Sequence, residues 1–106
     1  MILFTKEVEQ KAQKQYPLAD ELEKQMIVAK FFNPTGIGTW YLMNQDPEDR
    51  DYLWGIVDLH DVEVGSFSKS ELINFKGQFG LGIERDLYFD EINAKELFDK
   101  LINKKG

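Results

Sequence analysis

Apolar side chains recur at every second position through the middle of the chain. This alternation is typical of strands that bury one face. It predicts four strands, over residues 26–32, 39–44, 51–59 and 62–67. The connections between them are short, and parallel strands need long crossovers, so we expect an antiparallel meander.

The same alternation assigns side chains to the faces of the sheet. In the first strand one face carries Ile27, Ala29 and Phe31. In the second, Trp40 and Leu42 share one face and Tyr41 and Met43 the other. In the third, one face carries Leu53, Val57 and Leu59, and the other carries Tyr52, Trp54, Ile56 and Asp58. In the fourth, Val62 and Val64 should point inward and Glu63 outward.

Helical patterns occur at both ends of the chain and once in the middle. Thr5 can cap a helix over residues 5–15, whose narrow apolar stripe places it on the surface. Ser68-Lys69-Ser70-Glu71 matches a capping box for a helix over 69–75, and Asn93 can cap a helix over 94–104. Residues 19–25 suggest one further helical turn, with Leu22 facing inward.

The segments between these elements contain turn residues. Asn33-Pro34-Thr35-Gly36 is turn chemistry, residues 46–50 read as an exposed loop, and residues 83–89 should be extended. The whole chain, residues 1–106, is therefore predicted to be a single α+β domain. Its antiparallel sheet of about four strands would carry N-terminal, middle and C-terminal helices packed on it.

Composition excludes several kinds of chemistry. The chain has no cysteine and one histidine, so disulfides, thiol nucleophiles, cysteine zinc sites and sites with two imidazoles are excluded. No apolar run approaches the ~20 residues that span a bilayer, and the first residues lack the features of a signal peptide. We therefore expect no membrane association and a cytoplasmic protein.

The formal charge of −6 is concentrated in one stretch. Between residues 46 and 63 the only formal cation is Arg50, against seven acids: Asp46, Glu48, Asp49, Asp51, Asp58, Asp61 and Glu63. Such a surface repels nucleic acid and attracts basic partners. The alternative is a solvated loop that only keeps the protein soluble.

Large aromatic residues accompany the acidic stretch. If Tyr41, Tyr52 and Trp54 share an exposed sheet face, they would form an aromatic patch of the kind that often marks protein interfaces. Alternatively, these rings pack under the acidic loop or the N-terminal helix. The first interpretation makes them candidate anchors for a partner.

Candidate catalytic groups are few, and we assign no catalytic residue, metal or cofactor. Asp58, Asp61 and Glu63 are close in sequence and could bind a divalent cation weakly. His60 lies beside Asp61, but neighbouring residues of a turn usually point apart. The glycines at 77, 80 and 82 lack the order of a phosphate-binding loop.

A cation lies between two acids in the segment Glu84-Arg85-Asp86. In an extended segment Glu84 and Asp86 share a face, and Arg85 points away from them. We expect these residues to form structural ion pairs or a bidentate hold on a nearby loop. Substrate binding by Arg85 is the alternative.

Several segments resemble a known family. They are Ala29-Lys30-Phe31-Phe32-Asn33-Pro34, Thr39-Trp40-Tyr41, Trp54-Gly55-Ile56-Val57, Glu63-Val64-Gly65-Ser66-Phe67-Ser68 and Ser70-Glu71-Leu72, with Leu81-Gly82-Ile83-Glu84-Arg85-Asp86-Leu87-Tyr88-Phe89 as the most specific. Together they resemble domain-of-unknown-function family 2958, small proteins borne largely by bacterial plasmids, conjugative elements and phages. Asp58-Leu59-His60-Asp61 departs from the shorter, glycine-containing turn expected there. The resemblance implies a mobile-element setting but no reaction.

These observations favour a non-enzymatic inhibitor of a host nucleic-acid enzyme, of anti-CRISPR or anti-restriction type. Its carboxylates would imitate phosphates at a basic groove, so the expected partner is a basic protein and not nucleic acid. One alternative is a metal-dependent nucleic-acid-processing enzyme that uses Asp58, His60, Asp61 and Glu63. Another is an accessory or scaffold protein of the mobile element.

Overall fold

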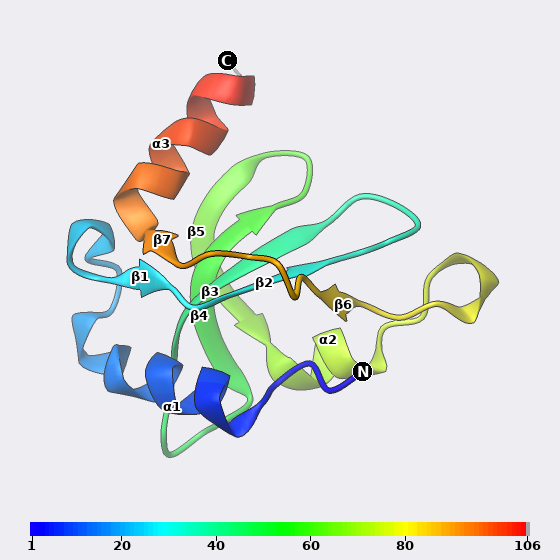
Figure 1. The fold of residues 1–106 in the computed structure, drawn as a ribbon, viewed down its shortest axis with the longest axis horizontal. Helices are drawn as coiled ribbons and strands as arrows, with labels where there is room; N and C mark the ends of the chain where they lie inside the picture. The colour runs from blue at the N-terminus through cyan, green and yellow to red at the C-terminus, as the bar shows by residue number, and fades with distance from the viewer. Residues whose placement is uncertain (106) are drawn as a thin grey trace.

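The computed structural model describes residues 1–105 and is built around a five-stranded antiparallel sheet (Figure 1). Its strands lie in the order β5-β4-β3-β2-β6. Their bounds are Ala29–Phe32 for β2, Thr39–Gln45 for β3, Tyr52–Asp58 for β4, Val62–Ser68 for β5 and Glu84–Arg85 for β6. The predicted meander is confirmed for β2 to β5, and β6 adds a short strand at the edge of β2.

The predicted strand over residues 26–32 is wrong as a single element, because it divides at Val28. Its first part, β1 (Met26–Ile27), pairs with β7 (Ile92–Asn93) in a separate two-stranded sheet. The chain turns there, although the Val28 amide still donates to the carbonyl of Leu42 at 2.8 Å. Ile27 consequently packs with a different cluster from Ala29 and Phe31.

The predicted helices and their caps are confirmed. The helices are α1 (Lys6–Lys14), α2 (Lys69–Asn74) and α3 (Ala94–Lys105). Thr5 Oγ1 accepts from the amide of Val8 at 3.1 Å, and Asn93 Oδ1 accepts from the amide of Glu96 at 3.1 Å. Short 3₁₀ turns are η1 (Tyr16–Leu18), η2 (Leu22–Lys24) and η3 (Gln78–Gly80). Turn η2 lies within the helical turn predicted over residues 19–25.

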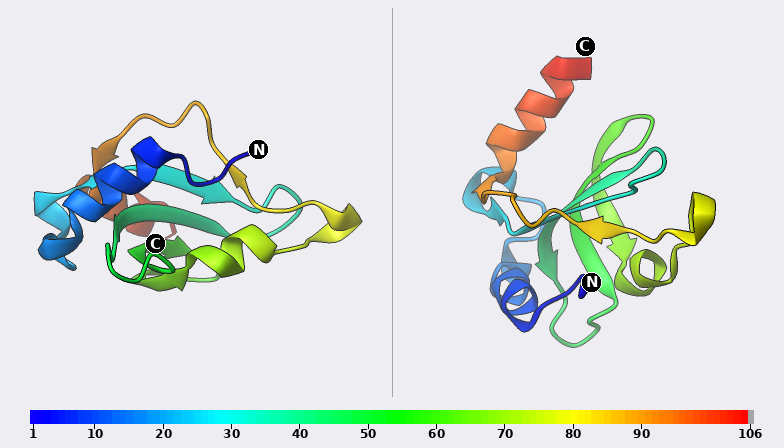
Figure 2. Two further views of the ribbon diagram at one scale, coloured as in Figure 1. Left: turned by 90° about the horizontal axis from the view of Figure 1, so that it is seen from below. Right: turned by 45° about the vertical axis from the view of Figure 1, so that its right-hand side comes forward.

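Two hydrophobic clusters hold the helices against the strands. One joins α1 and α2 to the sheet, and within it the rings of Phe4 and Phe31 stack at 4.8 Å. The other gathers Ile27, Tyr41 and Ile56 beneath the apolar stripe of α3. The N-terminal helix (blue) and the C-terminal helix (red) therefore occupy separate places against the strands (Figure 2). No helix within residues 1–105 is long and apolar enough to cross a bilayer.

Residues 83–89 are less extended than predicted. Only Glu84 and Arg85 form a strand, and the chain then turns, because the amide of Tyr88 donates to Asp86 Oδ1 at 2.9 Å. A short aspartate turn thus ends the strand after two residues and leaves Leu87 and Tyr88 exposed.

Candidate functional site

The acidic stretch does not form one continuous face. Four of its acids lie in the loop between β3 and β4, and the other three lie around the hairpin between β4 and β5. Strand β4 separates the two groups by seven residues, roughly 20 Å at the rise of an extended chain. The prediction of a single acidic face is therefore wrong, and each end must be judged by its own neighbours.

At the hairpin end the acids diverge. Asp58 pairs across the hairpin with Val62, so Asp58 and Glu63 project from opposite faces of the sheet. Asp58 also forms an ion pair with Lys105 at 2.7 Å, while His60 and Asp61 are exposed in the turn. Among residues 1–105 no group of three or more histidine, aspartate or glutamate side chains is placed to hold a metal ion. The acids that sequence suggested for a divalent cation are thus not brought together.

At the loop end, the buried carboxylate of Glu9 forms ion pairs with Arg50 and Lys69. Glu9 of α1, whose side chain is 7% exposed, accepts from Arg50 at 2.7 Å and from Lys69 at 3.0 Å. Gln45 Nε2 also donates to Glu9 at 2.7 Å. Burial raises the pKa of Glu9, but these hydrogen bonds and the charge of Lys69 together outweigh burial and hold that pKa below its usual value. The one arginine of the acidic stretch therefore binds Glu9, although its side chain remains 59% exposed.

Asp51 and Asp46 organise the loop. Asp51 Oδ1 accepts from the amide of Ser70 at 2.7 Å, and its other oxygen accepts from Ser68 Oγ at 2.8 Å. The hydrogen bond from the Ser70 amide lowers the pKa of Asp51 most, and the hydroxyls of Ser68 and Ser70 lower it further. Asp46 accepts from the Glu48 amide at 2.8 Å and from the Tyr16 hydroxyl at 3.2 Å. Glu48 and Asp49 are exposed, so they are the loop acids most open to a partner.

The three predicted aromatic anchors have different environments. Tyr41 is only 7% exposed and packs against Phe89, because residues 89–93 return over this part of the sheet. Its prediction as an exposed anchor is wrong, and burial raises the pKa of its hydroxyl. Tyr52 is 42% exposed and stacks on the half-buried Trp54, with ring centroids 6.5 Å apart and planes inclined by 14°.

Tyr52 and Trp54 line an open hollow of about 520 Å³, which we call the aromatic hollow. Its other lining residues are Tyr16, Pro17, Ala19, Asp20 and Asn44. Tyr16 comes from η1, and its bond to Asp46 ties the hollow to the acidic loop. None of the lining residues is basic, and Asp20 is exposed beside the rings. Through Tyr16, the aromatic hollow thus connects the predicted anchors Tyr52 and Trp54 to the predicted acid Asp46.

Sequence reasoning missed Tyr16, Asp20 and Asn44 as parts of this hollow. Tyr16 follows Val8 and Ala12 at four-residue spacing, but it begins the 3₁₀ turn η1, which contacts β3, instead of continuing α1. The Tyr16-Pro17 pair was the available signal, since proline favours the first turn of a new helical element.

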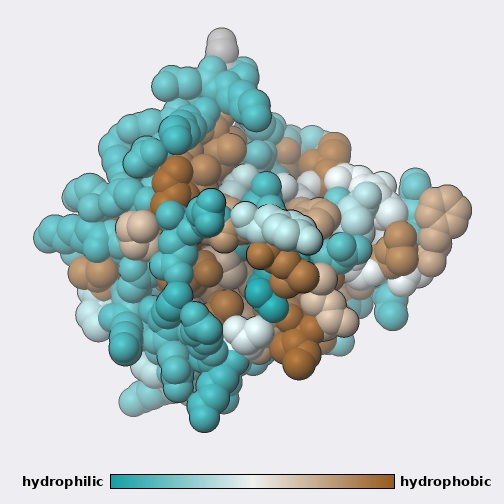
Figure 3. Space-filling view, in the orientation of Figure 1, coloured by the Kyte–Doolittle hydropathy of each residue, from teal (hydrophilic) through white to brown (hydrophobic). Residues whose placement is uncertain are grey.

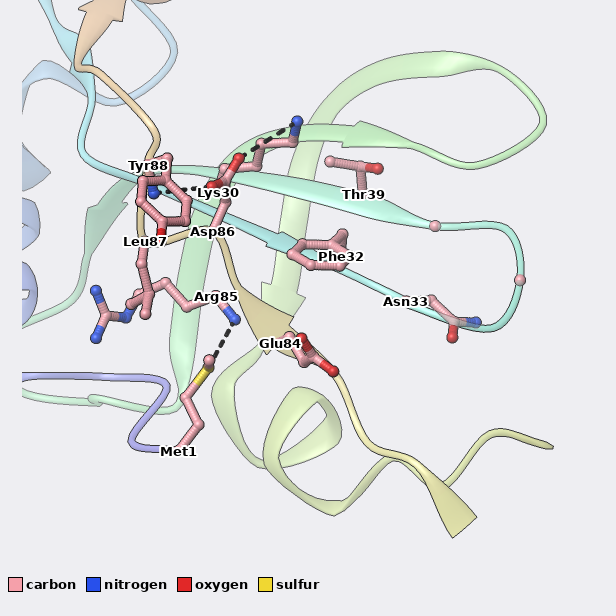
Figure 4. A pocket seen from close by; sticks show the side chains of 12 residues that line it. Met1, Lys30, Phe32, Asn33, Thr39, Glu84, Arg85, Asp86, Leu87 and Tyr88 are labelled. Carbon is pink, nitrogen blue, oxygen red and sulfur yellow. Dashed lines mark hydrogen bonds and ion pairs between the residues drawn. The ribbon is translucent and has the colours of Figure 1, made fainter. Parts of the chain in front are cut away.

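A second hollow, of about 510 Å³, lies where β2 meets β6 and the turn after it, and we call it the edge hollow (Figure 4). Lys30, Thr39 and Tyr88 line it together with the predicted ion-pairing residues Glu84, Arg85 and Asp86. Lys30 and Asp86 form an ion pair at 3.9 Å. Arg85 instead donates to the carbonyl of Ile2 at 3.3 Å, and its Nε is buried without a hydrogen-bond partner. Of the predicted trio, Asp86 forms an ion pair among residues 1–105, whereas Glu84 and Arg85 do not.

The surroundings of this edge hollow are partly apolar. Met1, Ile2 and Leu87 are each more than half exposed. Figure 3 shows apolar side chains gathered over the middle of this face of the molecule. The edge hollow therefore combines charges of both signs with exposed apolar surface.

The family model described as "Protein of unknown function (DUF2958)" matches residues 3–106, nearly the whole chain. The chain belongs to this family. Neither the curated proteins nor the solved structures contain a significant match. The family resemblance seen in the sequence is thus confirmed, and the α+β fold described above is the structural basis on which a role for this DUF2958 member can be argued.

Proposed function

We propose that this protein is a non-enzymatic binding protein that engages a basic surface of a partner protein through the acidic end of its sheet. The observation that supports this best is the pairing of Arg50 and Lys69 with the buried carboxylate of Glu9. Those cations bind Glu9, and among the described residues neither forms an ion pair with Glu48 or Asp49, which face solvent. A negative surface of this kind speeds association with a positive one.

The aromatic side chains supply the second part of the proposal. Interfaces gain most of their affinity from a few large side chains, among which tyrosine and tryptophan are enriched. Tyr52 is partly exposed beside the loop and is backed by Trp54. We therefore assign attraction of the partner to the carboxylates and much of the affinity to Tyr52.

For the partner we propose a host defence nuclease of the CRISPR or restriction type. Such enzymes hold nucleic acid in positively charged channels, and an acidic loop can compete for the same channel. The mobile-element setting expected for the DUF2958 family supports this choice, because such elements benefit from blocking these nucleases.

The test is charge reversal at one end of β4 with a matched reversal at the other. Glu48→Lys/Asp49→Lys changes two exposed loop acids, and Asp61→Lys/Glu63→Lys changes two exposed acids at the hairpin. DNA cleavage by purified RNA-guided and restriction nucleases is measured with each protein at 50 and 200 mM salt. We expect inhibition by the unaltered protein, weakened by salt, retained by the hairpin variant and lost in the loop variant. Absence of inhibition across the panel, or equal loss in both variants, would contradict the proposal.

A further inference from the structure

We propose that the aromatic hollow binds the guanidinium group of an arginine side chain presented by the partner. The inference rests on the proposed function and deepens it, since it names the group that the acidic end would recognise. Three features of the hollow carry it: the parallel rings, the acids around them and the fixed polar wall.

The rings offer the surface that a guanidinium prefers. The ring planes of Tyr52 and Trp54 are inclined by only 14°, so a planar group can lie parallel to both rings. Arginine is planar and weakly hydrated, and it stacks on aromatic faces better than the compact, strongly hydrated ammonium of lysine. Tryptophan and tyrosine are also the strongest cation–π partners among the side chains. Two nearly parallel rings at one hollow therefore favour arginine over lysine.

The charge around the rings has one sign. Asp20 lines the hollow, and Asp46 is held at its rim by the Tyr16 hydroxyl. No basic residue lines it, so a cation that enters meets no like charge at its wall. The carboxylates of Asp20 and Asp46 would accept N–H groups at the edge of a stacked guanidinium.

The polar wall is already in place. Asn44 is 1% exposed, and its Nδ2 donates to the carbonyl of Ala19 and to Gln25 Oε1, both at 3.0 Å. Gln25 Nε2 in turn donates to the carbonyls of Ala19 and Glu21, both at 3.1 Å. Both amide hydrogens of Asn44 are thus committed, which holds its side chain in place at the wall of the hollow. A wall fixed by such bonds does not have to be ordered on binding.

The first experiment follows the two indole N–H resonances of the full chain by NMR. The probes are N-acetyl-arginine amide, N-acetyl-lysine amide and the neutral isostere N-acetyl-citrulline amide. We expect a saturable shift of the Trp54 resonance with the arginine probe at millimolar concentration, weaker binding of the lysine probe and none of citrulline. Trp40 does not line the hollow and serves as the internal control. Equal shifts with all three probes, or no shift of Trp54, would overturn the inference.

The second experiment measures binding of hexa-arginine and hexa-lysine peptides to Tyr52→Leu and to Tyr88→Leu. Tyr52→Leu keeps an apolar side chain but removes the ring, so hexa-arginine should bind about threefold more weakly. Tyr88 is 93% exposed in the edge hollow, and its substitution should change nothing. Both variants are checked for folding by circular dichroism.

The two proposals fail in different ways. One set of results would show that the arginine site is wrong while the acidic binding surface stands. In it, the two peptides bind equally, Tyr52→Leu has no effect, and Glu48→Lys/Asp49→Lys abolishes binding. If hexa-arginine binds through Tyr52 but no nuclease is inhibited, the arginine site stands and the assigned partner is wrong.

Discussion

The aromatic hollow and the edge hollow have nearly equal volumes but differ in the residues and strands around them. The buried polar side chains reported for the described residues, Glu9, Gln25, Asn44 and Gln45, all lie at the loop end, around the aromatic hollow or under the acidic loop. Each forms hydrogen bonds with its neighbours. The edge hollow instead rests on the two-residue β6. Each hollow also has one buried nitrogen without a hydrogen-bond partner, Nε1 of Trp54 in the aromatic hollow and Nε of Arg85 in the edge hollow.

This difference indicates which hollow is preformed. A buried network of hydrogen bonds fixes the positions of its members. The polar wall of the aromatic hollow is therefore held by bonds between buried side chains. The edge hollow contains the segment that most resembles the family, and several of its hydrogen bonds are exposed to solvent.

The largest effect is expected from Gly55→Ala. A Cβ at Gly55 would lie 2.0 Å from the carbonyl oxygen of Tyr41, so β3 and β4 would have to separate. We expect the free energy of unfolding to fall by about 3 kcal/mol or more, measured by urea denaturation. Gly65 of β5 pairs with Gly55 of β4 and has open space around its Cβ position, so Gly65→Ala is the control and should change stability by less than about 0.5 kcal/mol. If Gly55→Ala destabilised the protein as little as Gly65→Ala, the close approach of β3 and β4 at Gly55 would not be required.

The next effect concerns the support beneath the acidic loop. Glu9→Gln removes a charge that holds Arg50 and Lys69, and should cost about 2 kcal/mol at pH 7. Asp86→Asn in the edge hollow breaks a pair at 3.9 Å and should cost less than about 0.5 kcal/mol. A comparable loss in the two variants would remove the contrast between the hollows.

The pH dependence of stability should differ between the unaltered protein and Glu9→Gln. The pKa of Glu9 in the folded state lies below its ordinary value of 4.5, so the carboxylate stabilises the fold above that pH. That stabilisation is lost as the pH falls through the folded pKa. The difference in unfolding free energy between the unaltered protein and Glu9→Gln should therefore shrink below pH 4.5. A difference that stays constant from pH 7 to pH 3 would mean that ionisation of Glu9 does not stabilise the fold.

Local signals in the sequence were sufficient for the caps, the meander and part of the candidate site. Thr5, Ser68 and Asn93 cap helices because a hydroxyl or amide oxygen needs only the amide three residues later. Tyr52 and Trp54 were placed on one side of β4 by alternation, and their nearness to the acidic loop followed from chain order.

Long-range contacts decided the features that sequence reasoning missed. The alternation from Ile27 to Phe31 has no break, yet pairing of β1 with β7 divides that segment. Tyr41 is buried by Phe89, which lies 48 residues away in the chain. Arg50 turns inward toward Glu9, 41 residues earlier. None of these partners can be identified from the local pattern of apolar and polar positions.

The smallest effect, and the sharpest contrast, should come from the two arginines. Arg50→Met loses two hydrogen bonds to Glu9 and leaves that buried carboxylate with fewer donors, so it should destabilise by about 1 kcal/mol despite its partial exposure. Arg85→Met loses one long bond to Ile2 but also removes a buried Nε that has no partner. Those contributions oppose each other, and methionine retains the apolar length of the side chain, so stability should change by less than about 0.5 kcal/mol. Paired urea denaturation curves measure both variants. A loss at Arg85 as large as that at Arg50 would mean that the edge hollow is held as firmly as the aromatic one.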